Sequence, residues 1–449
     1  MKNSVFFLLL TAVIWACDNH QKVRASGNGS DMPHHIKLSW EMSPATSQAV
    51  SWRTSSQVTT GYVEYLEATA APFFEENIKR ITASSDTLTS DDGCWTYHQA
   101  NMGDLSPDKI YSYRVGDGNN WSEWSEFKTA SGGDEPFKFV YFGDVQRFIQ
   151  TKGSRIIRQA MLNNSDARFM LFAGDLVHRG ALNIENWNEF FPAGGWIFQN
   201  IPTIATPGNH EHKKAKSGQG ISPLWALNFV FPKNGPDNQI EESYFIDYNN
   251  IRVISLNSSK FNTKDGLQKT LVWFEDRLKE FTGDWVIVTH HHAMSAVARN
   301  RGAKIRYPEF KALYEKYNVP LVLTGHEHAY ARGKMGPRFP TYVVSVAGPY
   351  QNAVRFEEWM ERVGASMQLF QEIYVTSDTL HYKSKTVLGD LYDEFVITKD
   401  EDGTLTMIEN DSLPAESLIP TKDFERRYDK EEVETYDGDR AAYLSRKKD

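Results

Sequence analysis

The sequence contains almost no cysteine: its 449 residues include two, Cys17 and Cys94. A chain of this length can bury full hydrophobic cores in two or more domains, so its stability does not require disulfide bonds. Cys17 also falls at the end of an N-terminal segment that we expect to be processed. Cys94 would then be the remaining unmodified thiol, and no intramolecular disulfide is expected in the mature chain.

Basic residues are fewer than acidic residues. The chain has 49 Lys and Arg against 58 Asp and Glu, which gives a formal net charge of -9 at pH 7, and it has no stripe rich in Lys or Arg. This balance argues against nucleic acid as a partner. Internal repeats and low-complexity tracts are absent as well, and the sequence leads us to infer no protein partner.

The N-terminal hydrophobic run is too short to cross a membrane. It extends from Val5 to Ala16, twelve residues, whereas a bilayer core needs about 20, and it is typical of a signal peptide over residues 1–17. The sequence "IWAC" resembles a bacterial lipoprotein cleavage box, which would leave Cys17 lipid-modified; the alternative is an ordinary secretory signal with an incidental cysteine. The polar residues 18–33 suit a flexible tether. We therefore expect an extracytoplasmic protein, lipid-anchored to a bacterial envelope on its periplasmic or cell-surface side.

Residues 34–130 have the pattern of short antiparallel strands. Five segments alternate apolar and polar residues between turn residues: "IKLSWEM", "QAVSWRT", "GYVEYLE", "TYHQANM" and "IYSYRVG". The run "LSPDKIYSYRV" resembles the fibronectin type III pattern in which a tyrosine corner ties a loop back to a strand, so Tyr111 or Tyr113 is expected to do this. We predict an all-β, fibronectin III-like sandwich that supports the molecule or frames a substrate.

The pattern changes after "SGGDEP", and residues 136–397 indicate an α/β domain. The buried-type strands "FKFVYFGD" and "ARFMLFAGD" flank the helix candidate "SRIIRQAMLNN", which favours a β-α-β unit with a parallel sheet. The amphipathic segments "TLVWFEDRLKEF" and "FKALYEKY" precede two more strands, "DWVIVTHHH" and "VPLVLTGHEH". Further strands are expected in "TYVVSVAG" and over residues 369–397. Residues 398–449 form a charged C-terminal extension with no clear pattern.

Five of these strands end in residues that bind divalent metal ions. They are Asp144 in "YFGDVQ", Asp175 in "FAGDLVH", Asn209 in "ATPGNHEH", His290 in "VIVTHHH", and His326 and His328 in "LTGHEH". Each motif alone has an ordinary interpretation as a turn. In an open α/β sheet, however, the carboxyl ends of the strands form one crevice, so these side chains are expected to converge there. Five such endings together indicate a metal site.

The order GD, GD, GNHE, H and GHxH resembles the metallophosphoesterase superfamily, and the preceding sandwich makes the resemblance closest to purple acid phosphatases. The similarity covers about residues 34–395, and "GNHE", "GHEHAYARG" and "SPATSQAVSWRT" are its most specific parts. It implies an α/β metallophosphoesterase sandwich, with two central sheets flanked by helices.

The resemblance also implies two divalent metal ions, of Fe, Zn or Mn, close enough to clamp a phosphoryl group. Asp175 would bridge them. The first ion would further take Asp144 and His328, and the second Asn209, His290 and His326. A hydroxide held by the ions would be the nucleophile.

His210 is expected to act as general acid on the leaving group or to donate a hydrogen bond to the phosphoryl oxygens, because imidazole is the side chain most often used for proton transfer near neutral pH. The alternative is that His210 only donates to a nearby carboxylate such as Glu211. Asn209, His210 and His291 are expected to contact the substrate. His212 and His292 are additional candidates, although histidines beside a ligand are often loop residues.

The sequence departs from the purple acid phosphatase pattern at two positions. His178 stands where that family has a tyrosine whose phenolate binds ferric iron, and a neutral imidazole suits Fe(II), Zn(II) or Mn(II) instead. Gln146 stands where that family has glycine and other metallophosphoesterases often have histidine. We predict a first ion held by Asp144, Asp175, His178 and His328. The competing interpretation is that His178 turns away and Gln146 or water fills the shell.

The sequence leaves three functions open. The first is hydrolysis of phosphate monoesters, with a small phosphorylated molecule as substrate. The second is a phosphodiesterase on the same two-metal core, because the loops "KKAKSGQGISPLW" and "MSAVARNRGAKIRY" carry basic residues that either meet extra phosphate or only solvate the surface. The third is a non-catalytic surface lipoprotein that binds glycans or partners through its sandwich. The enzyme hypotheses predict that Asp175→Asn abolishes function, and the third predicts no effect.

Overall fold

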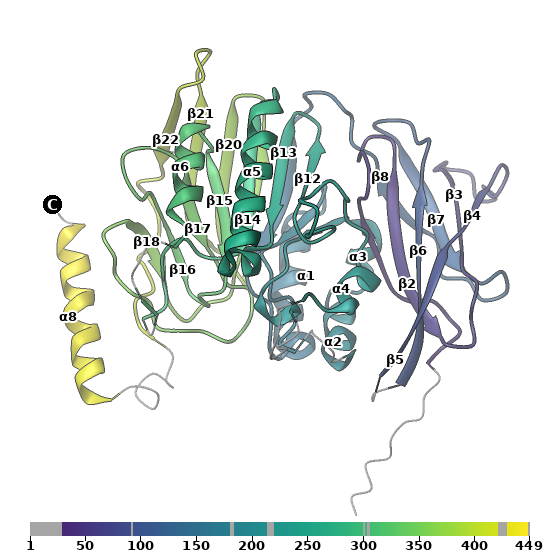
Figure 1. Ribbon diagram of the computed structural model, residues 1–449, viewed down its shortest axis with the longest axis horizontal. Coiled ribbons are helices and arrows are strands. Elements are labelled where there is room, and N and C mark those ends of the chain that lie inside the picture. The colour runs from purple at the N-terminus through teal and green to yellow at the C-terminus, as the bar shows by residue number, and fades with distance from the viewer. Residues whose placement is uncertain are drawn as a thin grey trace, which may run out of the picture.

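The computed structural model describes residues 29–90, 93–179, 184–212, 220–299, 301–302, 306–420 and 429–447. The expected signal peptide, Cys17 and most of the expected tether lie outside these residues. Figure 1 shows a β-sandwich at one end of the molecule, an α/β domain in the middle and one long C-terminal helix at the other end. Within the described part of the chain, no helix is both long enough and apolar enough to span a bilayer.

Two four-stranded antiparallel sheets form the N-terminal sandwich, in the orders β1-β2-β6-β5 and β4-β3-β7-β8. Their strands are β1 (His34–Ser39), β2 (Gln48–Ser55), β3 (Tyr62–Glu67), β4 (Lys79–Thr82), β5 (Ser84–Ser90), β6 (Gly93–Met102), β7 (Ile110–Gly116) and β8 (Ser125–Lys128). Side chains such as Leu38, Val50 and Val63 point inward from alternate positions and fill the space between the sheets. The predicted all-β sandwich is confirmed.

Tyr111 makes the tyrosine corner. Its hydroxyl accepts a hydrogen bond from the Ser106 backbone amide at 2.8 Å. Tyr113 lies on the same face of β7, and its hydroxyl donates to the Gln199 carbonyl at 2.7 Å, in the next domain. The Ser39 and Ser51 hydroxyls also donate to carbonyls of that domain, at 2.9 and 2.7 Å. The sandwich is therefore docked on the α/β domain through buried polar contacts.

The α/β domain contains two seven-stranded sheets. The first has the order β11-β10-β9-β19-β20-β21-β22 and the second β12-β13-β14-β15-β17-β16-β18. The first is built from β9 (Phe137–Phe142), β10 (Met170–Phe172), β11 (Thr203–Ala205), β19 (Leu369–Val375), β20 (Thr379–Thr386), β21 (Leu391–Lys399) and β22 (Leu405–Glu409). The second is built from β12 (Tyr244–Tyr248), β13 (Ile251–Leu256), β14 (Trp285–His292), β15 (Leu321–Gly325), β16 (Tyr330–Gly333), β17 (Thr341–Val344) and β18 (Met360–Gly364).

Parallel strands lie at one side of the first sheet and in the middle of the second. In the first sheet β10 pairs in parallel with β9 and β11, and in the second β14 pairs in parallel with β13 and β15. Their apolar side chains are buried almost throughout, which explains the continuous hydrophobic runs in the sequence. The predicted metallophosphoesterase fold, two sheets with flanking helices, is confirmed.

The α/β domain and the C-terminal extension contain helices, several of which flank the two sheets (Figure 1). They are η1 (Ile149–Gly153), α1 (Ser154–Asn163), α2 (Ile184–Gly194), α3 (Ile197–Asn200), η2 (Asn209–Glu211), α4 (Pro223–Asn228), η3 (Ser258–Asn262), α5 (Lys264–Glu280), α6 (Pro308–Lys316) and α8 (Lys430–Arg446). α1, α5 and α6 coincide with the three segments of helical periodicity. α5 begins where the Thr263 hydroxyl accepts from the Gly266 amide, a normal N-cap.

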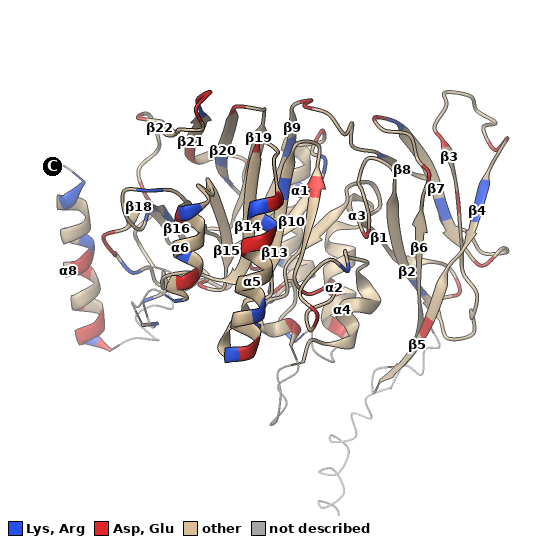
Figure 2. Ribbon diagram, turned by 45° about the horizontal axis from the view of Figure 1, so that its top comes forward, with Lys and Arg blue, Asp and Glu red and all other residues tan. Residues whose placement is uncertain are grey.

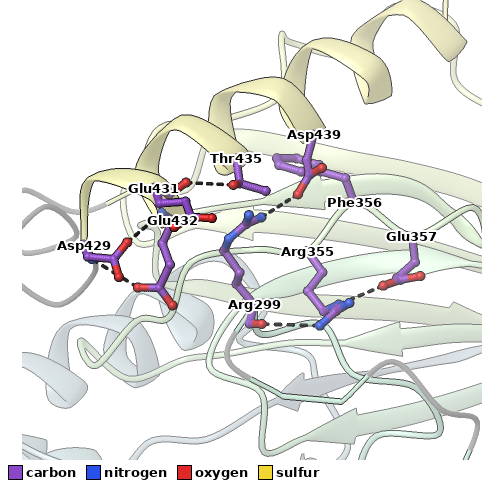
Figure 3. Close-up of a pocket in the computed structure, with 9 residues that line it drawn as sticks. All are labelled: Arg299, Arg355, Phe356, Glu357, Asp429, Glu431, Glu432, Thr435 and Asp439. Carbon is purple, nitrogen blue, oxygen red and sulfur yellow. Dashed lines mark hydrogen bonds and ion pairs between the residues drawn. The ribbon is translucent and has the colours of Figure 1, made fainter.

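The C-terminal extension has more structure than the sequence indicates. β22 adds an edge strand to the first sheet, and α8 lies against the loops that follow β14 and β17. Lys and Arg are interspersed with Asp and Glu along α8 (Figure 2), while Tyr436 and Tyr443 are buried against Phe356. Asp439 of α8 pairs with Arg299 at 2.7 Å (Figure 3). Two aromatic side chains and an ion pair therefore dock a helix that is otherwise polar.

Candidate metal centre

The predicted strand-end residues gather where the carboxyl ends of the two sheets meet. Asp144 and Asp175 follow β9 and β10, and Asn209 begins η2 just after β11. The second sheet contributes histidines from β14 and from the turn after β15. Two overlapping groups of candidate ligands result: Asp144, Asp175 and His328 in the first group, and Asp175, His291 and His326 in the second.

Two glycines of the motifs make room for the carboxylates. A Cβ atom on Gly208 would lie 2.2 Å from Asp175 Oδ1, and one on Gly325 would lie 2.3 Å from Asp144 Oδ1. No side chain fits at such distances, so the glycines of "GNHE" and "GHEH" are steric requirements of the site.

The ligand candidates also sit on unusual backbone. Asp175, His326 and His328 have φ of 50°, 72° and 53°, in the left-handed region that L-residues rarely adopt. Non-glycine residues in this conformation concentrate at functional sites, where the surrounding structure holds them in place.

The second group brings four donor atoms together. His291 Nε2 lies 3.1 Å from Asp175 Oδ2, 3.2 Å from Asn209 Oδ1 and 3.1 Å from His326 Nδ1. Atoms that share one ion at 2.0–2.2 Å are separated by about 3 to 3.5 Å. Asn209 Oδ1 thus lies with this group, and the three distances from His291 Nε2 match those between ligands of one ion.

The protonation of His291 shows that the second group of candidate ligands favours a positive charge. Its Nδ1 lies 2.8 Å from the Ala173 carbonyl, an acceptor, so Nδ1 carries a proton, and Nε2 is the ring atom that faces the Asp175 carboxylate. Burial opposes the imidazolium, but the charges of Asp175 and Asp144 outweigh it and raise the pKa of His291 to about 9. The pocket therefore attracts positive charge, which either a proton or a metal ion supplies.

The first group is arranged around the side-chain amide of Gln146. Its Nε2 lies 2.8 Å from Asp175 Oδ2, 3.4 Å from Asp144 Oδ2 and 3.1 Å from His328 Nε2. His328 Nδ1 donates to the Tyr350 carbonyl at 3.0 Å, so the Nε2 lone pair faces Asp144 Oδ2 at 3.3 Å. The sequence identified Gln146 only as an alternative, although the glutamine stands at the histidine position of related motifs.

One predicted ligand is not in the cluster. His290, expected at the second ion, is fully buried, and its ring stacks on Tyr314 with centroids 6.4 Å apart. His291 takes its place, because neighbouring residues of a strand point to opposite faces. The pairing of β14 with β15 shifts register between His290 and His292.

His178, expected at the first ion, also lies outside both groups. Its Nδ1 is 2.9 Å from Gln146 Oε1, so the glutamine stands between His178 and the carboxylates. Burial first, and then the charge of Arg147, lower the pKa of His178 to about 4. The imidazole is therefore neutral at physiological pH.

His210 lies above the shared carboxylate. Its backbone amide donates to Asp175 Oδ1 at 2.9 Å, its Nδ1 donates to the His178 carbonyl, and its Nε2 lies 3.8 Å from Asp175 Oδ2. Glu211, the alternative partner, instead accepts from the backbone amides of Asp175, Gly208 and Val177. Nε2 of His210 is therefore directed toward the cluster.

The two additional histidines have structural partners. His212 Nδ1 is 2.7 Å from the Gly208 carbonyl, and its Nε2 accepts from Asn257 Nδ2 at 3.0 Å. His292 Nδ1 lies 2.8 Å from the Ser258 hydroxyl, and its ring centroid is 4.3 Å from that of His326. Both rings pack behind the ligand candidates.

Sequence reasoning missed Glu327, which lies between the two histidines of "GHEH". Its carboxylate is completely buried and accepts from the backbone amides of Val297 and Ala298 at 3.0 and 2.9 Å. Arg301 also donates to it, at 3.3 Å. The only signal in the sequence is an acidic residue enclosed by two candidate ligands.

Two family models match the chain. Residues 137–330 match the calcineurin-like phosphoesterase family, and residues 33–129 match the purple acid phosphatase N-terminal domain. The chain therefore contains a calcineurin-like phosphoesterase domain preceded by a purple acid phosphatase N-terminal domain.

Individual relatives support this assignment. An uncharacterized protein of Mycobacterium tuberculosis is 25% identical over 328 residues, which cover 66% of this chain and 61% of that protein. The chain thus spans about three fifths of the length of that relative. Purple acid phosphatase 23 of Arabidopsis thaliana is 23% identical over 380 residues, 74% of this chain and 80% of the relative.

Two solved structures share the fold. The purple acid phosphatase PPD1 of yellow lupin seeds superposes with a TM-score of 0.67 at 18% identity, over 86% of this chain and 78% of that one. PhoD superposes with a TM-score of 0.61 at 10% identity, over 94% of this chain and 99% of that one.

Proposed function

We propose that the protein is a dinuclear metal-dependent phosphatase that hydrolyses phosphate monoesters. One observation carries the proposal: Nε2 of His291 and Nε2 of His328 face the carboxylates of Asp175 and Asp144 at 3.1 and 3.3 Å, an arrangement that bound cations stabilise. Asp175 belongs to both groups of candidate ligands, as a carboxylate that bridges two ions must.

The donor set fits two ions of the Fe, Zn or Mn type. The first would be held by Asp144, Asp175, His328 and the Gln146 amide, whose oxygen reaches the carboxylates when the amide turns over. The second would be held by Asp175, Asn209, His291 and His326. When bound, such ions supply an acidified water and neutralise charge on the phosphoryl group. A relative, the Fe(3+)-Zn(2+) purple acid phosphatase 12 of Arabidopsis thaliana, is 22% identical over 337 residues.

His210 is the proposed proton donor to the leaving group. Its Nδ1 is occupied by the His178 carbonyl, which fixes the tautomer and directs Nε2 toward the cluster. A proton on Nε2 would then pass to the ester oxygen as the bond to phosphorus breaks.

The neutral His178 in place of tyrosine makes a ferric phenolate impossible at that position. We therefore expect a purified, metal-loaded protein without the visible charge-transfer band of a purple enzyme. A purple protein would contradict the proposed first site.

Metal analysis together with a phosphoester panel tests the proposal. The protein should bind two ions per chain and hydrolyse 4-nitrophenyl phosphate. Asp175→Asn should lose nearly all hydrolysis and retain less metal, because both sites share this carboxylate. Asp166→Asn, a change at an exposed aspartate, is the matched control and should leave both unchanged. Metal-loaded protein that hydrolyses no ester would refute the proposed function.

A further inference from the structure

Arg147 directly follows the site residue Gln146 on a strained backbone. Arg147 and Phe148 have φ of 66° and 51°, and both are in the left-handed region although neither is glycine. The next five residues form η1, a π-helical turn, and the Ile149 amide is anchored on Glu189 Oε2 at 3.1 Å. Two strained residues followed by a π-turn are an arrangement found mostly at functional sites.

The guanidinium of Arg147 lies against an aromatic ring and has no carboxylate partner among the described residues. Its Cζ lies 4.1 Å from the centroid of the Tyr350 ring. Across the described ranges, its side chain forms no ion pair and donates no hydrogen bond, and Nε is buried without a partner. Elsewhere in the same domain, arginines that approach the site are paired: Arg301 and Arg306 both face Glu327.

The contact with Tyr350 leaves part of the guanidinium available. The Tyr350 ring lies against Cζ, but the Arg147 side chain is partly exposed, so its terminal NH2 groups can still donate to an acceptor. Tyr350 in turn belongs to the site, because its carbonyl accepts from His328 Nδ1 at 3.0 Å and its ring lies edge-on to His328, with centroids 4.9 Å apart. Together with burial, the charge of Arg147 lowers the pKa of His178, whose Nδ1 lies 2.9 Å from Gln146 Oε1.

We propose that Arg147 binds the terminal oxygens of a phosphate monoester dianion and thereby selects monoesters against diesters. This inference rests on the proposed function. A guanidinium matches two oxygens of one phosphate as a fork. A monoester offers three terminal oxygens and two negative charges. A diester has one charge fewer, and one of the three oxygens carries a carbon group that cannot accept in the same way.

Hydrolysis of two esters by matched variants tests the selection. In Arg147→Met, kcat/KM for 4-nitrophenyl phosphate should fall about 10- to 100-fold, the loss of a charged hydrogen-bonded pair. The value for bis(4-nitrophenyl) phosphate should change less than about threefold. Arg147→Lys keeps the charge but not the two-pronged guanidinium. Its kcat/KM for 4-nitrophenyl phosphate should lie between the values of the unchanged protein and of Arg147→Met. Arg155→Met, on the exposed side of α1, is the control.

Two readouts separate binding from a structural role. Arg147→Gly should be at least as stable to urea as the unchanged protein, because glycine relieves the positive φ, yet show the same loss of selectivity. Calorimetry with inorganic phosphate on metal-loaded protein should give affinities about 10- to 100-fold weaker for Arg147→Met.

These measurements distinguish a failure of the proposed phosphatase function from a failure of the proposed role of Arg147. If the unchanged protein hydrolyses neither ester, the proposed function fails, while phosphate calorimetry still tests Arg147. If Arg147→Met loses both esters equally, loses metal, or binds phosphate as tightly as before, the role of Arg147 is refuted.

Discussion

Neighbouring histidines on β14 have different tasks at the residue scale. His291 faces Asp175, Asn209 and His326, whereas His290 is buried against Tyr314. Three consecutive histidines on a strand look equivalent in sequence, and the register shift between His290 and His292 is a property of the sheet. The sequence therefore predicts a histidine ligand here but not which one.

Replacing these two histidines should separate metal binding from packing. His291→Gln should weaken binding of one ion at least about tenfold, because it removes a donor at the centre of the second group. His290→Gln should keep both ions and lower the free energy of unfolding instead, since it disturbs a buried ring. Metal titration and urea denaturation of both variants measure this. Loss of metal in His290→Gln would contradict the assignment.

His98 gives the sandwich a defined sensitivity to acid. The ring is buried, stacks on Trp52 and lies 2.7 Å from the hydroxyls of both Thr54 and Ser85. Burial lowers its pKa from 6.5 to about 4. The unfolded chain takes up a proton as the pH falls through 6.5, but the folded chain does not do so until about pH 4. The contribution of His98 to the free energy of unfolding is therefore complete above pH 6.5 and is lost progressively toward pH 4.

The expected loss attributable to His98 is about 3 kcal/mol between these limits. It can be measured as the difference in unfolding free energy between the unchanged protein and His98→Gln at pH 7 and at pH 4.5. The difference should shrink at the lower pH. A difference independent of pH would show that His98 does not titrate on unfolding.

At the scale of elements, the turn after β15 depends on the loop after β14. Glu327 lies between His326 and His328 and holds the amides of Val297 and Ala298. Further along the same loop, Arg299 is paired with α8 (Figure 3). One buried carboxylate thus joins two loops and sets the orientation of both histidines.

Removing this anchor should loosen the site without removing a ligand. Glu327→Ala should weaken metal affinity about 10- to 100-fold, the usual effect of losing an outer-shell partner. Glu327→Gln, which retains one acceptor oxygen, should lose less. Glu309→Ala, at an exposed position of α6, serves as the control in metal titrations. Unchanged affinity in Glu327→Ala would mean that the turn holds its shape alone.

Elements differ in how well the sequence predicts them. β9, β10, β14 and β15 are largely apolar, and α1 and α5 have clear helical periodicity, so their sequence patterns identify them. α8 was not predictable, because Tyr436 and Tyr443 are its only fully buried side chains and its docking depends on Arg299, far away in sequence. Contacts between distant segments leave little local pattern.

For the whole molecule, a buried ion network joins the two sheets of the α/β domain. Arg332 of β16 is completely buried and donates to Asp393 of β21, at 3.1 and 2.9 Å, and to Glu409 of β22, at 2.6 and 2.8 Å. Asp393 is itself fully buried and also accepts from the Tyr330 hydroxyl at 2.6 Å.

Breaking one side of this network should be costly. Arg332→Met should lower the free energy of unfolding by about 3 to 5 kcal/mol, because it removes the closer of the two arginines that pair with the buried Asp393 carboxylate, leaving Arg362 at 3.7 Å. The double variant Arg332→Met/Asp393→Leu should recover most of the loss. Urea denaturation of the three proteins gives the comparison. Equal stability of the single and double variants would mean that Asp393 is accommodated without Arg332.

The polar contacts of Tyr113, Ser39 and Ser51 with the α/β domain have a practical consequence. They leave little room for a hinge, so the sandwich and the centre that it accompanies should tumble in solution as one body. Cys94, a thiol of β6 that is partly exposed, is then a natural attachment point for a spectroscopic label. Such a label would report the orientation of the entire molecule and not that of a loosely tethered module.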